Sequence, residues 1–531
     1  MKIAGFRLVL APFLIALIGA TSAAIADDQP FTVEELRGKR IYVEGETESG
    51  RPVTAVVARG GTPIPASILP CVGCHGNDGK GRPEGGVVPT DINWKYLTAS
   101  YGHEHTYGRK HPSFDTVSVA RAVILGKDPA GNDLDVAMPR YEISEQDISD
   151  LIAYLKRLED DFDPGISDDS IRVGTLLPNS GSQADLGEAM RKVIAAQFAE
   201  INAAGGIHGR KLELVVADYG EQSQNSVWQA RDLMQREKVF ALVSGYAIGV
   251  EESLAALAEE LEIPVIGPYT QTPREGNGLE RHSFYLSSGM EQQAAVLIRH
   301  SQGGSGKAAG RTAVIHPALS AYTSVMERVQ AELEKLQADK PLMLGYQPPY
   351  VDVVDLVQTL SKRDIRNVLF LGTARDLQRL AEEATAKGYE PVLMLPGVFA
   401  GAEMLEAGAN FGGEIRVAYP STPADHTALG ITEFEALHRD HSFGFDYSPA
   451  QISAFVATKV FVEVLKRSGR ALSREKLLAA LEGLADYRSG LMPPISYNRS
   501  RRIGAFGAYV ITLDLQNQRF GETSNWISLQ L

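Results

Sequence analysis

Cysteine is almost absent from this chain, with two residues in 531. Both lie in the segment Cys71-Val72-Gly73-Cys74-His75, which leaves no other cysteine for a disulfide or for the second ligand pair of a structural zinc site. The folded chain must therefore be held together by its hydrophobic cores.

Positive charge is also scarce, because 52 Lys and Arg residues stand against 66 Asp and Glu residues, for a formal net charge of −14. This balance argues against nucleic acid or an anionic lipid surface as a partner, since both attract basic proteins. An acidic surface is still compatible with a basic redox partner protein.

Long hydrophobic runs are confined to the N-terminus. Lys2 and Arg7 precede the apolar run Leu8 to Ile18, and the small residues of Thr21 to Ala26 follow it, which predicts a signal peptide cleaved near Ala26. The alternative is a membrane anchor, but the run is short for a bilayer span. We expect residues 1–26 to be removed, which leaves a charge of −16, a location in the periplasm and no transmembrane segment.

The two cysteines and the histidine after them have the spacing required for covalent attachment of c-type haem. Each thiol of Cys71 and Cys74 adds across one vinyl group, and an imidazole nitrogen of His75 binds the iron. One pair of thiols predicts one covalent haem per chain. The alternatives for such a pair are half of a zinc site, a redox-active dithiol and an ordinary disulfide.

An acidic segment divides the chain into two differently patterned regions. Glu159 to Asp169 contains six acidic residues and a Pro164-Gly165 turn, as a solvated linker would. We expect a first domain at residues 31–160, an acidic linker at 161–170 and a larger second domain at 171–531.

The first region resembles class I cytochrome c in several separate features. Gly38 and Tyr42 lie in an opening helical segment, where a glycine allows a second helix to cross closely. The haem motif is followed by the glycine-rich turn Gly76 to Gly81 and by Pro89, which is similar to the proline whose carbonyl orients the ligand histidine in that family. The resemblance implies a small all-α domain that carries electrons.

The end of this region is patterned as a closing helix. Ser144 with Asp147 is a helix-start signal, and an apolar stripe follows. The stripe consists of Ile148, Leu151, Ile152 and Leu155, with Tyr154 where the family usually has an aromatic residue. One feature departs from the family, because Glu44 to Ile68 separate the opening helix from the haem motif and their Val53 to Val57 run predicts an inserted hairpin.

By the same resemblance the sixth iron ligand is Met138, in a loop just before the closing helix. Pro139 disfavours the alternative, a methionine in a helical core. The rival ligands are His103, His105 and His111. These three histidines could instead bind zinc or copper, or form a solvated loop.

From Ile171 onward, short apolar strands alternate with amphipathic helices, which predicts a parallel sheet covered on both faces. Ile171 to Leu177 is the first strand, and Pro178 to Ser182 turns the chain into a helix with an apolar stripe. The second region is therefore expected to have a different architecture from the first.

The stretch Ile201 to Leu214 looks very like the type I periplasmic binding proteins for branched-chain amino acids, in which a Gly pair ends a helix and a second strand follows at once. The resemblance continues through Phe240 to Gly245, Ile263 to Pro268, Ala313 to Ile315 and Asn367 to Gly372. It implies two doubly wound lobes that close on a small molecule. The expected fold class is thus multidomain, with a small all-α domain followed by a two-lobed α/β domain.

In that family the ligand lies at strand ends and helix starts, where free backbone N–H groups hold an anionic group. By resemblance the site draws on turn residues of both lobes. These are Ser180, Gly181, Tyr246, Ala247, Ile248, Gly249, Tyr269, Thr270, Gln271, Thr272, Ala321 or Tyr322, Thr373 and Ala374.

The sequence departs from the family at the position that holds an amino acid's ammonium group. Amino-acid binders keep a carboxylate near Pro396-Gly397, whereas this chain has Leu395 to Phe399 there, so we expect no preference for leucine, isoleucine or valine unless another acid such as Glu403 reaches the site. The site's three tyrosines favour an aromatic acid or an alcohol-derived ligand, although they could instead pack the lobes together.

These features predict a binding and electron-carrying protein rather than an enzyme, because no Ser/His/Asp arrangement in a recognisable motif is present. Three roles remain open. The chain could be a solute receptor for an ABC-type membrane permease, an electron acceptor for a periplasmic quinoprotein-type dehydrogenase, or a sensor of ligand and redox state.

Overall fold

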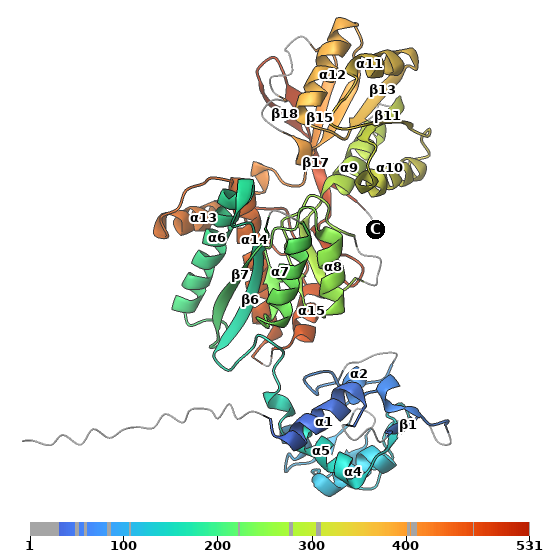
Figure 1. Cartoon of the computed structure of the whole chain (residues 1–531), viewed down its shortest axis with the longest axis vertical. Helices are drawn as coiled ribbons and strands as arrows, with labels where there is room; N and C mark the ends of the chain where they lie inside the picture. Colours follow the sequence, from blue (N-terminus) through green and yellow to red (C-terminus); the bar gives the residue numbers. More distant parts are fainter. Residues whose placement is uncertain are drawn as a thin grey trace, which may run out of the picture. The chain divides into compact units, whose positions relative to one another are not determined.

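The computed structural model describes residues 31–47, 52–57, 61–81, 86–105, 108–220, 223–275, 280–303, 310–400, 404, 411–470 and 472–529. It divides the chain into two compact units, Met1–Asp161 and Phe162–Leu531 (Figure 1). The expected signal peptide lies outside the described residues. Within the described part of the chain, no helix combines the length and the apolar character that a membrane span requires.

The first unit is mainly helical. Its helices are α1 (Val33–Glu44), α2 (Cys71–His75), α3 (Trp94–Leu97), α4 (Thr116–Leu125) and α5 (Glu145–Leu155), with short 3₁₀ turns at Ala66–Ile68 and Leu158–Asp160. Thr32 and Glu35 form a capping box at the start of α1, and the Ser144 hydroxyl accepts the Asp147 amide at the start of α5, as predicted.

Helices α1 and α5 pack at very close range, because Gly38 has no side chain at their contact. A Cβ atom at this position would lie 2.0 Å from the carbonyl oxygen of Asp150. The crossing buries Tyr42 and Tyr154, whose ring centroids are 5.5 Å apart, in the core of the unit. The predicted close helix crossing at Gly38 is confirmed.

The insertion between α1 and α2 does form a hairpin. β1 (Thr54–Val56) pairs with β2 (Ile64–Pro65), and β5 (Arg140–Glu142) adds to the other edge of β1 to make a three-stranded antiparallel sheet. A second, two-stranded hairpin joins β3 (His103–Glu104) to β4 (Lys110–His111). Since β5 begins two residues after Met138, the insertion supports the loop that carries this methionine.

The acidic segment at 161–170 is more ordered than its composition indicates, because its acids have specific partners. The Asp161 carboxylate binds the Lys39 ammonium group at 2.8 Å and the Tyr154 hydroxyl at 2.6 Å, inside the first unit. Asp163 accepts the backbone amide of Arg474 at 2.5 Å, inside the second unit. Ordered residues of both units therefore reach the boundary between Asp161 and Phe162.

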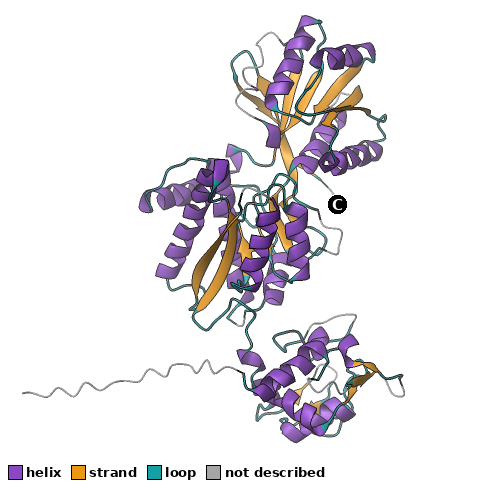
Figure 2. Cartoon of the chain, viewed as in Figure 1, coloured by secondary structure: helices purple, strands orange, loops and turns teal. Residues whose placement is uncertain are grey.

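The second unit has two lobes, each with a sheet between helices (Figure 2). The first lobe has a six-stranded parallel sheet in the order β16-β10-β9-β8-β6-β7. Its strands are β6 (Ser170–Leu177), β7 (Lys211–Asp218), β8 (Ala241–Val243), β9 (Val265–Ile266), β10 (Ser283–Ser287) and β16 (Ile503–Ala505). Its helices are α6 (Ala184–Ala203), α7 (Ser223–Gln235), α8 (Glu251–Glu260), α13 (Ala428–Asp440), α14 (Ser448–Ser468) and α15 (Arg474–Glu482). One core joins the sheet to α6, α13, α14 and α15, and a second joins it to α7 and α8.

The second lobe has an eight-stranded sheet in the order β12-β11-β13-β14-β15-β17-β18, with β19 also paired to β17. The strands are β11 (Arg311–Pro317), β12 (Leu342–Tyr346), β13 (Ile365–Phe370), β14 (Val392–Pro396), β15 (Glu414–Tyr419), β17 (Gly507–Asp514), β18 (Arg519–Thr523) and β19 (Ile527–Ser528). Helices α9 (Met290–Gly303) and α10 (Thr323–Lys335) share one core with the sheet, and α11 (Val353–Lys362) and α12 (Ala374–Ala386) share another. The chain enters this lobe after β10, leaves it after β15 and returns between β16 and β17.

Candidate functional site

The haem-attachment motif forms helix α2, which begins after Pro70 and ends at Gly76. The Tyr42 hydroxyl donates a 2.7 Å hydrogen bond to the Gly76 carbonyl and so fixes the end of this helix against α1. Burial raises the pKa of the Cys71 thiol to about 12. A protonated thiol is a poor redox nucleophile, so this environment disfavours the dithiol alternative.

His75 is buried, with one ring nitrogen already engaged. Its Nδ1 lies 3.1 Å from the Thr90 carbonyl oxygen, to which a neutral imidazole donates, and Nε2 is therefore the nitrogen left to bind iron. Burial also lowers the pKa of His75, which favours the neutral form. The prediction that the Pro89 carbonyl orients the His75 ring is therefore wrong by one residue. The Pro89 oxygen instead packs against Gly81, where a Cβ atom would lie 2.3 Å from it.

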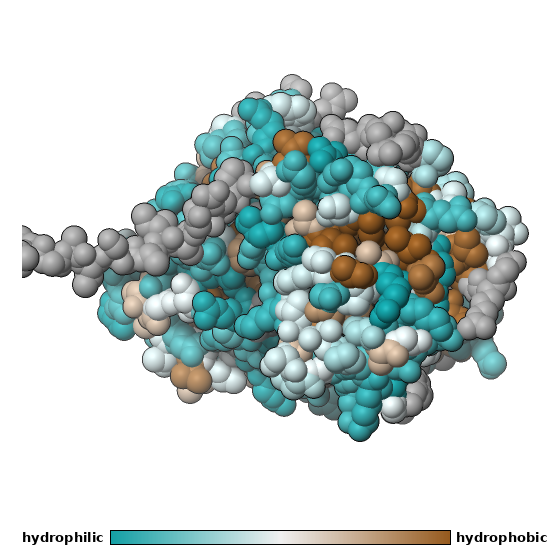
Figure 3. All heavy atoms as spheres, turned by 90° about the horizontal axis from the view of Figure 1, so that it is seen from below, coloured by the Kyte–Doolittle hydropathy of each residue, from teal (hydrophilic) through white to brown (hydrophobic). Residues whose placement is uncertain are grey.

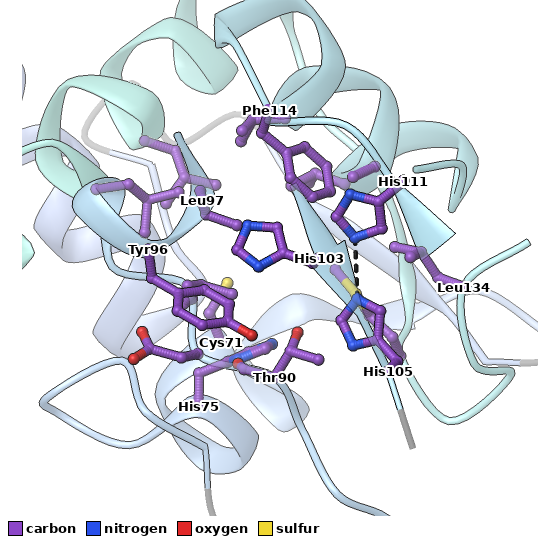
Figure 4. Close-up of a pocket in the computed structure, with 18 of the residues that line it drawn as sticks. Cys71, His75, Thr90, Tyr96, Leu97, His103, His105, His111, Phe114 and Leu134 are labelled. Atoms are coloured by element: carbon purple, nitrogen blue, oxygen red, sulfur yellow. Dashed lines mark hydrogen bonds between the residues drawn. The ribbon is translucent and has the colours of Figure 1, made fainter. Parts of the chain in front are cut away.

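A cavity opens in front of His75. Cys71, His75 and Met138 all line it, and most of the remaining wall is apolar. The apolar residues are Ile92, Leu97, Phe114, Val119, Ala122, Val123, Leu134, Leu151 and Leu155. In Figure 4, His111 and Phe114 lie across the cavity from His75 and Thr90.

Met138 is half-buried in the loop between α4 and β5. Arg140 organises this loop by donating to the carbonyl oxygens of Met138 and Leu134. The Arg140 guanidinium also lies directly over Gly126, at the end of α4, where a Cβ atom would clash with it. The sequence prediction did not include Arg140, whose only signal is its position two residues after the methionine.

The three rival histidines lie on and beside the β3–β4 hairpin and also line the cavity. Nδ1 of His111 is 2.8 Å from the Pro112 carbonyl and therefore donates to it, so Nε2 of His111 accepts from Nε2 of His105 at 2.9 Å (Figure 4). Among the described residues, no group of three or more His, Cys, Asp or Glu side chains is arranged to hold a metal ion. The hairpin is not a solvated loop either, because His103 and His111 are buried.

Arg109, beside these histidines, lines the same cavity and brings positive charge to it. Its Nη1 donates to the buried Asp128 carboxylate at 3.0 Å, and Asp128 also accepts the amide of Asn132 at 2.9 Å. This network fixes the Arg109 side chain to the loop after α4.

In the second unit, the predicted ligand residues of the first lobe lie together at the carboxyl ends of adjacent strands. Ser180 and Gly181 follow β6, the segment Tyr246 to Gly249 follows β8, and Tyr269 to Thr272 follow β9. The rings of Tyr246 and Tyr269 are 6.2 Å apart, and the backbones of these two residues form a parallel bridge. The side chain of Ala247 points into the core, and its amide donates to the Tyr269 carbonyl at 2.9 Å.

Sequence reasoning missed Asp218, Tyr219 and Glu251, which lie in the same group of turns. The rings of Tyr219 and Tyr246 meet edge to face at 4.9 Å. Glu251 accepts hydrogen bonds from the Gly249 amide and the Thr270 hydroxyl. The sequence signal that could have identified Asp218 and Tyr219 is their position after the strand predicted to follow the Gly pair.

The second lobe contributes aromatic rings at its own strand ends. Tyr322 stacks on Phe399, with centroids 6.4 Å apart, and Tyr346 stacks on Phe370 at the same separation. Thr373 is the N-cap of α12, where its hydroxyl bonds the Asp376 carboxylate at 2.7 Å. Phe399 follows the end of β14, and Glu403 lies outside the described residues.

Comparison with known proteins identifies both parts of the chain. The cytochrome c family matches residues 69–159, and the periplasmic binding protein family matches residues 170–518. The "Leu/Ile/Val-binding protein homolog 7" of Brucella suis biovar 1 (strain 1330) is 25% identical over 310 residues, which cover 56% of this chain and 77% of that protein. The "Leu/Ile/Val-binding protein homolog 8" of Brucella abortus (strain 2308) is 24% identical over 328 residues, 59% of this chain and 80% of that protein.

Solved structures agree on the fold of the second unit. A branched-chain amino acid ABC transporter protein from Thermus thermophilus with bound valine matches with a TM-score of 0.54 at 15% identity, over 68% of this chain and 97% of that one. A putative branched-chain amino acid ABC transporter protein from Rhodospirillum rubrum matches with a TM-score of 0.53 at 14% identity, over 66% of this chain and 99% of that one. The chain belongs to the periplasmic binding protein family and carries a cytochrome c domain ahead of its binding domain.

Proposed function

We propose that the chain is an exported periplasmic protein that combines electron transfer by one covalent haem c with the binding of a small molecule. The observation that carries this proposal is the cavity of the first unit, on which both the attachment motif and Met138 open. The cytochrome c family match supports the cofactor, and the periplasmic binding protein match supports the ligand-binding half and the compartment.

The residues around the cavity fit a haem. The thiols of Cys71 in the cavity wall and of the exposed Cys74 at its outer part would attach it. Nε2 of His75 would bind the iron, and the apolar wall would enclose the porphyrin ring. Arg109 supplies a positive charge for the carboxylate groups that the ring carries. Haem held in this way supplies reversible one-electron transfer.

Side chains and backbone groups of the chain would set the reduction potential of the haem. Thr90 fixes the orientation of the His75 ring, and Arg140 fixes the loop that presents the Met138 thioether. A thioether ligand raises the reduction potential, and the buried wall limits access of water.

For the second unit we propose the role of solute receptor for an ABC-type permease. The proposed ligand contacts are the turns after β6, β8 and β9 in the first lobe and the turns around Tyr322 and Thr373 in the second. The names of the Brucella relatives support a receptor role, whereas the aromatic pair Tyr322 and Phe399 favours a ligand other than an aliphatic amino acid.

A second candidate role is electron acceptor for a periplasmic quinoprotein-type dehydrogenase, and the surface of the first unit favours it. Val88 and Val136 line the outer part of the haem cavity and are each 65% exposed. Figure 3 shows hydrophobic residues gathered in one area of the face seen from below. An apolar rim of this kind is suited to brief docking of a redox protein.

If this role holds, Val136→Asp will lower the second-order rate of haem reduction by such an enzyme, and an unchanged rate would count against it.

Covalent haem content tests the first half of the proposal. Protein matured with a cytochrome c assembly system should retain one haem per chain after denaturation and acid extraction. The double variant Cys71→Ala/Cys74→Ala should retain none, while the control Val72→Ala, which keeps both thiols, should retain the full amount. Loss of all haem from the wild-type protein on extraction would disprove covalent attachment.

A further inference from the structure

In the first lobe of the binding unit, carboxylates of the chain itself accept the hydrogen bonds that an anionic ligand would be expected to accept. Glu251 is the first residue of α8, and its Oε2 accepts the Gly249 amide at 2.8 Å. Its Oε1 accepts the Thr270 hydroxyl at 2.7 Å. An amide and a hydroxyl that could hold a ligand carboxylate are therefore already bonded to a carboxylate of the chain.

Asp218 repeats this arrangement at the neighbouring turn. Its Oδ1 accepts the amides of Asn179 and Gly220, each at 3.0 Å, and its Oδ2 accepts the Ser180 hydroxyl at 3.3 Å. Among the described residues, neither Asp218 nor Glu251 takes part in an ion pair. A ligand carboxylate placed at these turns would meet two negative charges.

The aromatic rings beside these carboxylates add an apolar surface. Tyr219, Tyr246 and Tyr269 are half-buried and lie in sequence around the same strand ends, with neighbouring centroids 4.9 and 6.2 Å apart. The Tyr219 hydroxyl donates to the Ile248 carbonyl at 2.5 Å, which fixes this ring beside Gly249. Burial raises the pKa of Tyr246, and the negative charge of Glu251 adds to the effect, so the carboxylate is within electrostatic reach of this ring.

Glu251 can still accept a further hydrogen bond. A carboxylate offers about four acceptor positions, and the two bonds to Gly249 and Thr270 use one on each oxygen. A carboxylate beside tyrosine faces suits a group that donates hydrogen bonds, whether a hydroxyl or an ammonium group. It does not suit an anion.

We propose that the first lobe selects a ligand with a hydroxyl or ammonium group on an apolar or aromatic body, through Glu251 and the adjacent tyrosines, and rejects carboxylates. This inference rests on the proposed binding function and names the ligand class of that same site. It also changes the sequence-based expectation of the ligand, since it excludes an aromatic acid, retains an alcohol-derived ligand and adds an amine.

Calorimetry on the haem-loaded full chain can test this selection with probes that share one body. The probes are 2-phenylethanol, 2-phenylethylamine and phenylacetate, with leucine as the amino acid. We expect the alcohol or the amine to bind at least tenfold more tightly than phenylacetate and leucine, and the tighter of the two identifies the donor group.

A charge-neutral variant tests the residue itself. Glu251→Gln should reduce the preference for the alcohol or amine over phenylacetate at least tenfold. Glu252→Gln, which alters the next acid of the same helix, an exposed one, should leave the preference unchanged. Circular dichroism and thermal unfolding of both variants will show whether the fold is retained, and Glu251→Ala gives a second reading if the glutamine variant misfolds.

The outcomes separate the inference from the proposed function. Tighter binding of phenylacetate or leucine by the wild-type protein, an unchanged preference in Glu251→Gln, or no binding of any of the four probes would overturn the inferred ligand class. The binding function itself fails only if a thermal-shift screen of a wide range of small metabolites also gives no stabilisation.

Discussion

At the scale of single residues, the haem site depends on a few groups that the sequence places unambiguously and on others that it does not. Cys71, Cys74 and His75 are identified by covalent spacing alone, which no fold can alter. The carbonyl that orients His75 belongs to Thr90 and not to Pro89, because the path of the loop decides which of two adjacent oxygens faces the ring. Glu251 escaped prediction for the same reason, since its role exists only once the turns after β8 and β9 lie side by side.

Replacement of Met138 tests the sixth ligand. Met138→Ala should abolish the weak near-infrared sulfur-to-iron band of the ferric form and lower the reduction potential by on the order of 0.1 V, within the ~0.8 V range that axial ligands control. His103→Ala and His105→Ala should leave both properties nearly unchanged. If a histidine variant removes the spectroscopic signature and Met138→Ala does not, the ligand lies in the β3–β4 hairpin.

Ser244, at the end of β8, offers a test of local strain in the binding unit. Its φ angle of 56° is unfavourable for a residue with a side chain, and its buried hydroxyl has no hydrogen-bond partner in the described structure. Ser244→Gly should therefore raise the free energy of unfolding by about 1–2 kcal/mol. Ser244→Ala removes only the hydroxyl, so urea unfolding followed by circular dichroism should give it a smaller gain, and an equal or larger gain would argue against backbone strain.

At the scale of elements, long and strongly patterned segments are predictable from the sequence, and short ones are not. The opening and closing helices of the first unit and the first strand of the second follow from caps and apolar periodicity. The four-residue α3 and the two-residue strands β3 and β4 have no periodicity to detect, and they exist because tertiary contacts hold them. The pairing of the inserted hairpin with β5 is likewise a long-range contact that a local pattern does not encode.

The α1–α5 crossing can be tested by adding one methyl group. A Cβ atom at Gly38 would lie 2.0 Å from the Asp150 carbonyl oxygen and 2.8 Å from Cβ of Tyr154, so the helices must separate to accommodate Gly38→Ala. Overpacking of this kind costs about 1–3 kcal/mol. The change in the haem absorbance band that accompanies urea unfolding should shift to lower urea by the corresponding amount.

A surface variant of the same helix is the control for this crossing. Arg40 pairs with Glu44 and Glu46 on the exposed side of α1, and exposed pairs contribute little. Arg40→Ala should change stability by no more than about 0.5 kcal/mol. A Gly38→Ala protein as stable as the wild type would show that the two helices do not meet as closely as described.

At the scale of the whole molecule, the two-unit organisation is readable because the pattern changes from a haem motif among short helices to alternating strands and helices. The doubly wound lobes are predictable since buried parallel strands are continuous apolar runs. The placement of β16 in the first lobe and β17 in the second cannot be predicted in this way, because the passage of the chain from one lobe to the other has no signal in the local composition. The acidic segment was expected to be solvated, yet Asp161 and Asp163 each bind within their own unit.

The junction between the units leads to a prediction about coupling between haem and ligand. If closure of the lobes on a ligand favours one oxidation state of the haem, reciprocity requires that oxidation change ligand affinity by the same factor. The residues on either side of the boundary bond within their own units, with Asp161 bonded to Lys39 and Tyr154 in the first and Phe162 against Arg210 in the second. We therefore expect affinities of the fully reduced and fully oxidised protein to agree within about threefold, as a receptor or an electron carrier with tethered parts requires.

Calorimetry with the tightest-binding probe on dithionite-reduced and ferricyanide-oxidised protein measures this directly. A tenfold difference, equal to about 1.4 kcal/mol, would contradict the independence of the units and make a sensor of ligand and redox state the better account of the chain.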